Sequence, residues 1–137
     1  MLLSALVLRP GDAAILDGIG NAYFGKKEYA RAVEYLAKAA ASSSVPEAQR
    51  AEAYHTMGLA YNELENLRAE AAALTNAVTL AEDDTPWLTD ALYMLGDAHW
   101  RLNNASGAKS AWKRYLARSP TNAVEVNAVR RRLLQYN

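Results

Sequence analysis

Apolar residues recur at helical spacing in three short stretches of the chain, and each stretch carries a glycine at the same place. The stretches are ILDGIGNAYF, YHTMGLAYNE and LYMLGDAHWR, and their glycines, spaced 38 residues apart, are Gly20, Gly58 and Gly96. In the first stretch, Leu16, Ile19 and Tyr23 fall on one side of a helix. Such regular spacing is typical of stacked repeats, in which each unit buries its apolar side against its neighbours.

Each glycine stretch is expected to open a pair of helices. In the first pair the break falls near 25–27, and the second helix covers about 29–41. In the second pair the break falls near 65–66, and the second helix ends at about 80. The third pair covers roughly 86–118, with an internal turn at 103–104. From about 122 a last helix carries its apolar residues on one side: Val126, Val129, Leu133 and Tyr136.

Polar and proline-containing segments separate the helix pairs at 42–46, 82–86 and 119–120. Ser44, followed by Glu47 three residues later, fits a capping box for the next helix. Thr85 and Pro86 fit an N-cap and a first helical turn. The start of each repeat is therefore predicted from local signals.

These elements divide a single repeat domain into five segments. Residues 1–12 are expected to be the tail helix of an upstream partial repeat, residues 13–46, 47–86 and 87–120 the three repeats, and residues 121–137 a capping helix. The first eight residues lack the basic leader and cleavage site of a signal peptide, and they are too few to span a bilayer. A half repeat leaves an apolar patch without a partner helix, so we expect a longer parent protein or an oligomer that covers the patch.

Composition supports a helical globular protein, with 51% hydrophobic and 22% charged residues. No cysteine is present, which excludes disulfides and thiolate metal sites. The net charge of zero implies neither a nucleic-acid nor a membrane partner, but the charge is uneven. Residues 47–100 carry ten acids against two bases, whereas residues 101–137 carry eight bases against Glu125 alone.

The pattern resembles the tetratricopeptide repeat family, whose motif is a helix-turn-helix of about 34 residues. Four residues before each glycine are Leu16, Tyr54 and Leu92, and three residues after it are Tyr23, Tyr61 and His99. Sixteen residues after each glycine are Leu36, Leu74 and Trp112. The resemblance implies an all-α fold: a right-handed superhelical solenoid of helix pairs with a C-terminal capping helix.

Two departures from the family pattern affect what we expect of the turns and crossings. Twelve residues after the glycine, where the family has a small residue, Glu70 stands between Ala32 and Ala108 of the other repeats. The middle pair is therefore expected to cross differently or to slip by one residue onto Ala71. The glycine expected seven residues after the landmark is replaced in all three repeats, by Lys27, Glu65 and Asn103.

The resemblance also implies a ligand groove, because in this family one face of each first helix lines the concave surface that grips a peptide. By helical arithmetic, that face holds residues at five offsets from each glycine. The candidate groove residues are Asp17, Asn21, Phe24, Glu52, His55, Asn62, Glu63, Asp90, Tyr93, Asp97, Trp100 and Arg101.

The chemistry of these residues favours a basic peptide with apolar anchors. Carboxylates accept paired hydrogen bonds from arginine, and Phe24, Tyr93 and Trp100 offer apolar and cation-π contacts. The set does not suit the best-known ligand of the family, an acidic C-terminal tail held by lysine, asparagine and arginine, because Asn21 alone matches that clamp. Acids on a helix face are also common as plain solvated surface, and that interpretation stays open.

Other function classes have weaker support. His55 and His99 lie 44 residues apart, and the chain has no phosphate loop, HExxH or nucleophile motif, so we expect neither an enzyme nor a bound cofactor or metal. Self-assembly is the main alternative, because an apolar N-terminal half repeat, an acidic middle and a basic end could stack head to tail. A nucleic acid on the basic third is disfavoured. The alanine-rich, cysteine-free composition suggests a bacterial protein. The sequence does not identify a compartment, and the cytoplasm is the default expectation for a chain in which we find neither a signal peptide nor a transmembrane segment.

Overall fold

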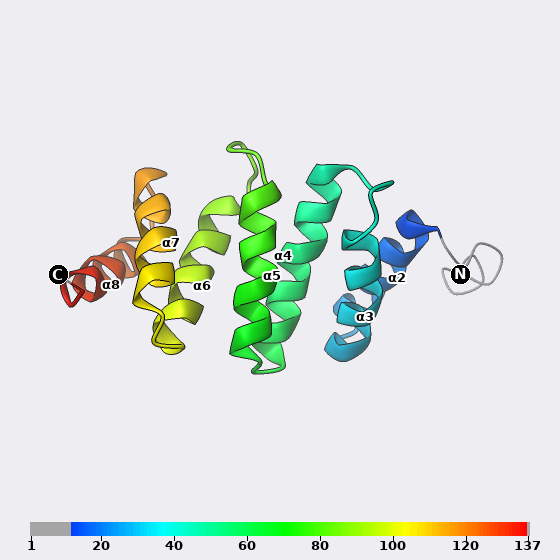
Figure 1. The fold of residues 1–137 in the computed structure, drawn as a ribbon, viewed down its shortest axis with the longest axis horizontal. Helices are drawn as coiled ribbons and strands as arrows, with labels where there is room; N and C mark the ends of the chain where they lie inside the picture. Colours follow the sequence, from blue (N-terminus) through cyan, green and yellow to red (C-terminus); the bar gives the residue numbers. More distant parts are fainter. Residues whose placement is uncertain (1–11, 137) are drawn as a thin grey trace. The chain divides into compact units, whose positions relative to one another are not determined.

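The computed structural model describes residues 12–136, and within them it contains seven α-helices and no strand (Figure 1). The all-α prediction is therefore confirmed for this part of the chain. The helices are α2 (Ala13–Gly25), α3 (Tyr29–Ala40), α4 (Glu47–Glu63), α5 (Leu67–Leu80), α6 (Leu88–Arg101), α7 (Ala105–Ala117) and α8 (Ala123–Leu134). The helix expected at 2–9 and its apolar patch lie outside the described residues.

The chain divides into two compact units, residues 1–83 and residues 84–137. In the first unit α2 packs against α3, α3 against α4, and α4 against α5, while α2 also approaches α4. In the second unit α6 packs against α7, and α8 follows against α7. Both units are thus built from antiparallel helix pairs, as the sequence predicts.

In each helix pair, a side chain of the second helix packs directly onto the landmark glycine of the first. A Cβ added to Gly20 would lie 2.6 Å from Cγ of Leu36, and one added to Gly58 would lie 2.6 Å from Cδ2 of Leu74. At Gly96 the facing residue is Trp112. Real Cβ atoms do not come this close to other side chains, so a larger residue at any of the three glycines would force the facing side chain to shift.

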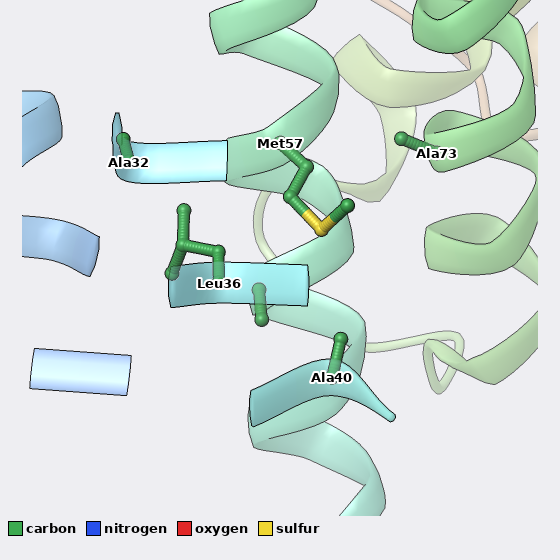
Figure 2. Packing of buried hydrophobic residues seen from close by; sticks show 6 residues of the cluster. Ala32, Leu36, Ala40, Met57 and Ala73 are labelled. Atoms are coloured by element: carbon green, nitrogen blue, oxygen red, sulfur yellow. The ribbon is translucent and has the colours of Figure 1, made fainter. Parts of the chain in front are cut away.

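The core of the first unit is made mainly of small side chains. Ala32, Leu36 and Ala40 of α3 cluster with Ala53 and Met57 of α4 and with Ala73 of α5. Figure 2 shows the flexible thioether of Met57 reaching between α3 and α5. Methionine fills irregular gaps well, so Met57 completes the packing that the alanines leave open.

The turn inside each pair has a left-handed residue at the position where the family pattern has glycine. Lys27, Glu65 and Asn103 have φ of 63°, 57° and 60°. The glycine conformation is therefore kept although the glycine is not. For a side chain other than glycine or asparagine this backbone costs about 1–2 kcal/mol.

Helix starts differ in two places from the local signals in the sequence. The side chains of Asp12, Asn66, Asn104 and Asn122 do cap α2, α5, α7 and α8. The capping box predicted for Ser44 and Glu47 is wrong, because Pro46 is the N-cap of α4 and no side chain accepts a bond there. The prediction of Thr85 as N-cap of α6 is also wrong, since α6 begins at Leu88 with Trp87 as its N-cap.

Glu70 occupies the small-residue position of the middle pair and is 3% exposed. Because Gly58 still faces Leu74, the middle pair keeps the register of the first pair. A slip by one residue onto Ala71 is therefore wrong. Nδ2 of Asn62 donates a hydrogen bond to Oε1 of Glu70 at 3.2 Å, which helps to satisfy the buried carboxylate.

Candidate functional site

In the first unit, the candidate face brings together carboxylates from two helices. Asp17 on α2 is half-buried, and burial raises the pKa of its carboxyl. The negative charge of Glu52 on α4 raises that pKa further, so the two groups lie near enough to repel. Nδ2 of Asn21 donates to Oδ2 of Asp17 at 3.3 Å. This surface therefore concentrates negative charge, and the carboxylate of Asp17 within it is partly shielded from water.

The remaining candidates of the first unit differ in how much they are tied into the fold. Phe24 is half-buried and meets the ring of Tyr29 edge-on, with centroids 5.6 Å apart. Asn62, although exposed, is bonded to Glu70. His55 is half-buried and Glu63 is exposed. Phe24 and Asn62 thus have structural contacts besides any role toward a ligand.

In the second unit, the candidate residues of α6 form a stripe of mixed acids and aromatics. Asp90 and Arg101 are exposed, whereas Tyr93, Asp97 and Trp100 are half-buried. The ring of Tyr93 packs against the buried ring of Tyr115, with centroids 5.6 Å apart. Burial raises the pKa of the Tyr93 hydroxyl, and the charges of Asp97 and Glu125 raise it further while Arg132 opposes them.

Arg132 of α8 contacts this stripe directly. Its Nη1 donates to Oδ1 of Asp97 at 3.1 Å, and each side chain is about one third exposed. Its guanidinium also lies over the ring of Trp100, 5.2 Å from the centroid, and 5.8 Å from that of Trp112. The face of α6 therefore already holds one arginine, through a carboxylate and an indole together.

Tyr136, just beyond α8, adds an aromatic contact at the end of the stripe. Its ring meets Trp100 edge-on, with centroids 5.6 Å apart. Toward the other end of α8, the hydroxyl of Tyr115 donates to Oε1 of Glu125 at 3.0 Å. Burial, with this bond to a carboxylate, raises the pKa of Tyr115. Helix α8 thus contacts the rest of the second unit near both of its ends.

Two hollows flank these contacts within the second unit. One, of about 290 Å³, has a lining that is polar and apolar in equal measure and includes Asp90, Tyr115, Arg118 and Glu125. The other, of about 470 Å³, is lined by Trp100, Arg101, Asn103, Gln135 and Tyr136. Asp90, Trp100 and Arg101 are candidate groove residues, so both hollows lie along the predicted face of α6.

Among the described residues, no group of histidines and carboxylates is arranged to hold a metal ion. Within the same residues, every helix is either too short or too polar to cross a bilayer. The arrangement offers charge, aromatic rings and two shallow hollows, which are the means of binding another chain.

Comparison with known families agrees with the repeat pattern. Residues 13–44 and 51–84 match one tetratricopeptide repeat model, and residues 90–122 match a second. The chain belongs to the tetratricopeptide repeat family. Tetratricopeptide repeats generally serve as interaction scaffolds that bind peptides or proteins. No curated protein sequence is similar enough to be aligned as a relative.

Solved tetratricopeptide repeat structures share the fold at low sequence identity. The first TPR of Spaghetti (RPAP3), bound to the HSP90 peptide SRMEEVD, superposes with a TM-score of 0.66 at 23% identity, covering 90% of this chain and 91% of that one. PilF of Pseudomonas aeruginosa superposes with a TM-score of 0.71 at 14% identity, covering 98% of this chain and 62% of that one. MamA superposes with a TM-score of 0.71 at 22% identity, covering 98% of this chain and 80% of that one.

The sequence did not lead us to include Arg132, Tyr136 or Glu125 among the site residues of this TPR protein. Residues 121–137 were expected to form only a capping helix, and a cation such as Arg132 in the last turn of a helix is already favoured by the helix dipole. One signal was present: Glu125, Val129, Arg132 and Tyr136 are spaced four, three and four residues apart, which places them on one side of a helix.

Proposed function

We propose that this tetratricopeptide repeat protein is a non-catalytic scaffold that binds a basic segment of a partner protein with apolar anchors. The observation that carries the proposal is the pairing of Asp17 with Glu52 across α2 and α4. Like charges at short range destabilise one another, and here one of them is also partly buried. A ligand cation placed between them relieves both costs.

Arginine is the side chain that suits such a pair best. Its guanidinium presents several donors in one plane, and it loses less hydration on binding than an ammonium does. The contact of Arg132 with Asp97 and Trp100 supports this chemistry, because an arginine from the same chain uses it in the second unit. Half-buried Phe24 in the first unit and Tyr93 and Trp100 in the second supply apolar anchoring surface.

An acidic ligand is disfavoured. The peptide bound to the Spaghetti TPR, SRMEEVD, carries three acids and one arginine. Residues 47–100 of the present chain carry ten acids against two bases, so an acidic segment would meet repulsion there. The shared fold therefore does not imply a shared ligand.

The test is a peptide-library screen against the full chain, run beside an Asp17→Asn, Glu52→Gln double variant. We expect the library to enrich arginine- or lysine-containing peptides with aromatic or aliphatic anchors. The dissociation constant of an enriched peptide, measured by fluorescence anisotropy, should rise about tenfold in the variant. Affinity in the wild type should also fall as salt is raised, because partly exposed charges are screened.

A matched control removes the same two charges elsewhere. Glu34 on α3 and Glu82 after α5 are both exposed and lie outside the candidate face. A Glu34→Gln, Glu82→Gln variant should bind as the wild type does. An equal loss of peptide affinity in both variants would mean that net charge alone attracts the peptide, and the proposed site on α2 and α4 would be wrong.

Self-assembly is a second candidate, supported by exposed apolar residues on α8. Val124 is 80% exposed and Leu134 is 71% exposed. Light scattering of the wild type and of a Val124→Asp, Leu134→Asp variant tests this alternative. Association that depends on salt and disappears in the variant would favour a head-to-tail oligomer over peptide capture.

A further inference from the structure

Helix α8 presents a single stripe of side chains to the rest of the second unit. The stripe consists of Glu125, Val129, Arg132 and Tyr136, at helical spacing. Glu125 accepts from the Tyr115 hydroxyl, Val129 is fully buried, Arg132 pairs with Asp97, and Tyr136 meets Trp100. Helix α8, whose arginine is followed four positions later by an aromatic residue just beyond the last helical turn, is thus seated against α7 and the candidate face of α6.

The residues that α8 engages on α6 are those predicted to face a ligand. Asp97 and Trp100 follow Gly96 by one and four residues, and both belong to the candidate groove. The contacts of α8 use the chemistry proposed for a partner, with a guanidinium on a carboxylate and an aromatic ring on an indole. The face is therefore occupied by a segment of its own chain.

The attachment of α8 is slight compared with that of the helices inside the repeats. Of the twelve residues of α8, all within the described part of the chain, Val129 alone is buried. The first helix of the second repeat, α4, buries five residues. The Arg132–Asp97 pair is about one third exposed, so water and salt weaken it. Twelve-residue helices are marginal alone in water, and α8 therefore belongs among the least stable elements.

The two hollows give an incoming segment places to bind before α8 leaves. Asp90 and Glu125 are among the residues that line the hollow of about 290 Å³, and the hollow of about 470 Å³ lies beside Trp100 and Tyr136. A partner side chain can enter either hollow while α8 is still seated. Displacement can then proceed along the helix from one end.

We infer that α8 is an intramolecular competitor for the face of α6, displaced by a partner helix that carries an arginine and an aromatic residue four positions later. The inference rests on the proposed function of that face and names its ligand pattern. Because α8 is tethered to its site, it acts at a high effective concentration. A partner must overcome this competition, so its apparent affinity is reduced by the fraction of chains in which α8 is seated.

The probe for this inference is a labelled synthetic peptide with the sequence of residues 122–136, NAVEVNAVRRRLLQY. It is titrated into the full-length wild type, an Arg132→Ala variant and an Arg131→Ala variant. Arg131 is exposed and carries the same charge, so its variant is the matched control. Arg132→Ala weakens the seated α8 but leaves the face of α6 intact, and we expect it to bind the peptide on the order of tenfold more tightly. Arg131→Ala should bind as the wild type does.

Two further variants show where the peptide binds. Adding Asp97→Asn to Arg132→Ala should abolish the gain, because the face then lacks its carboxylate. Tyr136→Ala, which removes the other contact with Trp100 at the very end of the chain, should also raise peptide affinity. This second variant keeps the inference testable if Arg132→Ala proves poorly folded by circular dichroism.

Equal peptide binding by the wild type, Arg132→Ala and Tyr136→Ala would overturn the inference. A wild-type dimer that the peptide dissociates would also overturn it, since the seated helix would then come from a second copy. The result of this titration can be distinguished from the result of the peptide-library screen. If Asp17→Asn, Glu52→Gln changes nothing but Arg132→Ala gains affinity, the proposed ligand site on the first unit fails while the competition by α8 stands.

Discussion

The indole of Trp112 lies so close to Gly96 that no Cβ fits between α6 and α7. Trp112 is fully buried, and its Nε1 donates to the backbone oxygen of Tyr93 at 3.2 Å. A planar ring held by a hydrogen bond cannot move aside as the end of a flexible chain can. This crossing is therefore the least tolerant of the three glycine positions.

Substitution of Gly96 by alanine should destabilise the second unit by about 1–3 kcal/mol, because the added methyl group overpacks the crossing. Denaturant unfolding followed by tryptophan fluorescence measures this directly, since Trp87, Trp100 and Trp112 all lie within residues 84–137. Gly25→Ala is the control. A Cβ at Gly25 meets nothing within 4 Å, so circular dichroism should detect no destabilisation of the first unit.

Glycine at the left-handed turn residues should stabilise the protein. Lys27 and Glu65 hold a backbone that costs a side chain about 1–2 kcal/mol, and the greater freedom of glycine in the unfolded chain offsets part of this gain. We expect Lys27→Gly and Glu65→Gly each to raise the free energy of unfolding by about 0.5–1 kcal/mol. Asn103→Gly should gain less, because asparagine tolerates this conformation. A loss of stability in Lys27→Gly, measured by urea unfolding, would show that the lysine side chain makes a compensating contact.

The raised pKa of Asp17 makes its charge a cost to the folded state. Its carboxyl keeps a proton to higher pH when folded than when unfolded, so stability falls as the pH rises from 3.8 through the folded pKa. At neutral pH the full cost is present. Asp17→Asn should therefore melt at a higher temperature than the wild type at pH 7, and the difference should disappear on acidification below 3.8. A difference that is independent of pH would assign the effect to packing.

His99 should make the second unit sensitive to mild acid. Burial lowers its pKa below 6.5, so the unfolded chain takes up the proton first and stability falls as the pH drops from 6.5 through the folded pKa. Tyrosine stands at the corresponding position of the other two repeats, as Tyr23 and Tyr61. Replacement of His99 by tyrosine should remove this acid-dependent loss, measured as the thermal midpoint of the second unit between pH 7 and pH 5. If the thermal midpoint of the variant falls with pH as steeply as that of the wild type, another group is responsible for the acid sensitivity.

The helix pairs could be predicted from the sequence because their cause is local and repeated. Each pair needs a glycine where its helices touch and an apolar residue sixteen positions later, and both leave a mark at fixed spacing. The caps were less predictable. Ser44 and Thr85 have the right chemistry for N-caps, but α4 and α6 begin three residues after them, at Glu47 and Leu88.

The contacts of α8 could not be predicted because they join residues far apart in the chain. Arg132 and Asp97 are 35 residues apart, and neither position has a family pattern that names its partner. The same holds for Asp17 and Glu52, whose mutual effect depends on how α2 and α4 approach one another. The sequence predicted which residues share a face, while the structure was needed to find which of them already have a partner.

The left-handed turns of the first two pairs depend on the packing of the helices that they join. Lys27 and Glu65 adopt a backbone that is unfavourable for their own side chains, so the turn is not stabilised by its own sequence. The close packing of Gly20 against Leu36 and of Gly58 against Leu74, which joins residues sixteen positions apart, offsets this cost. A substitution that loosens either crossing should therefore also loosen the turn of the same pair.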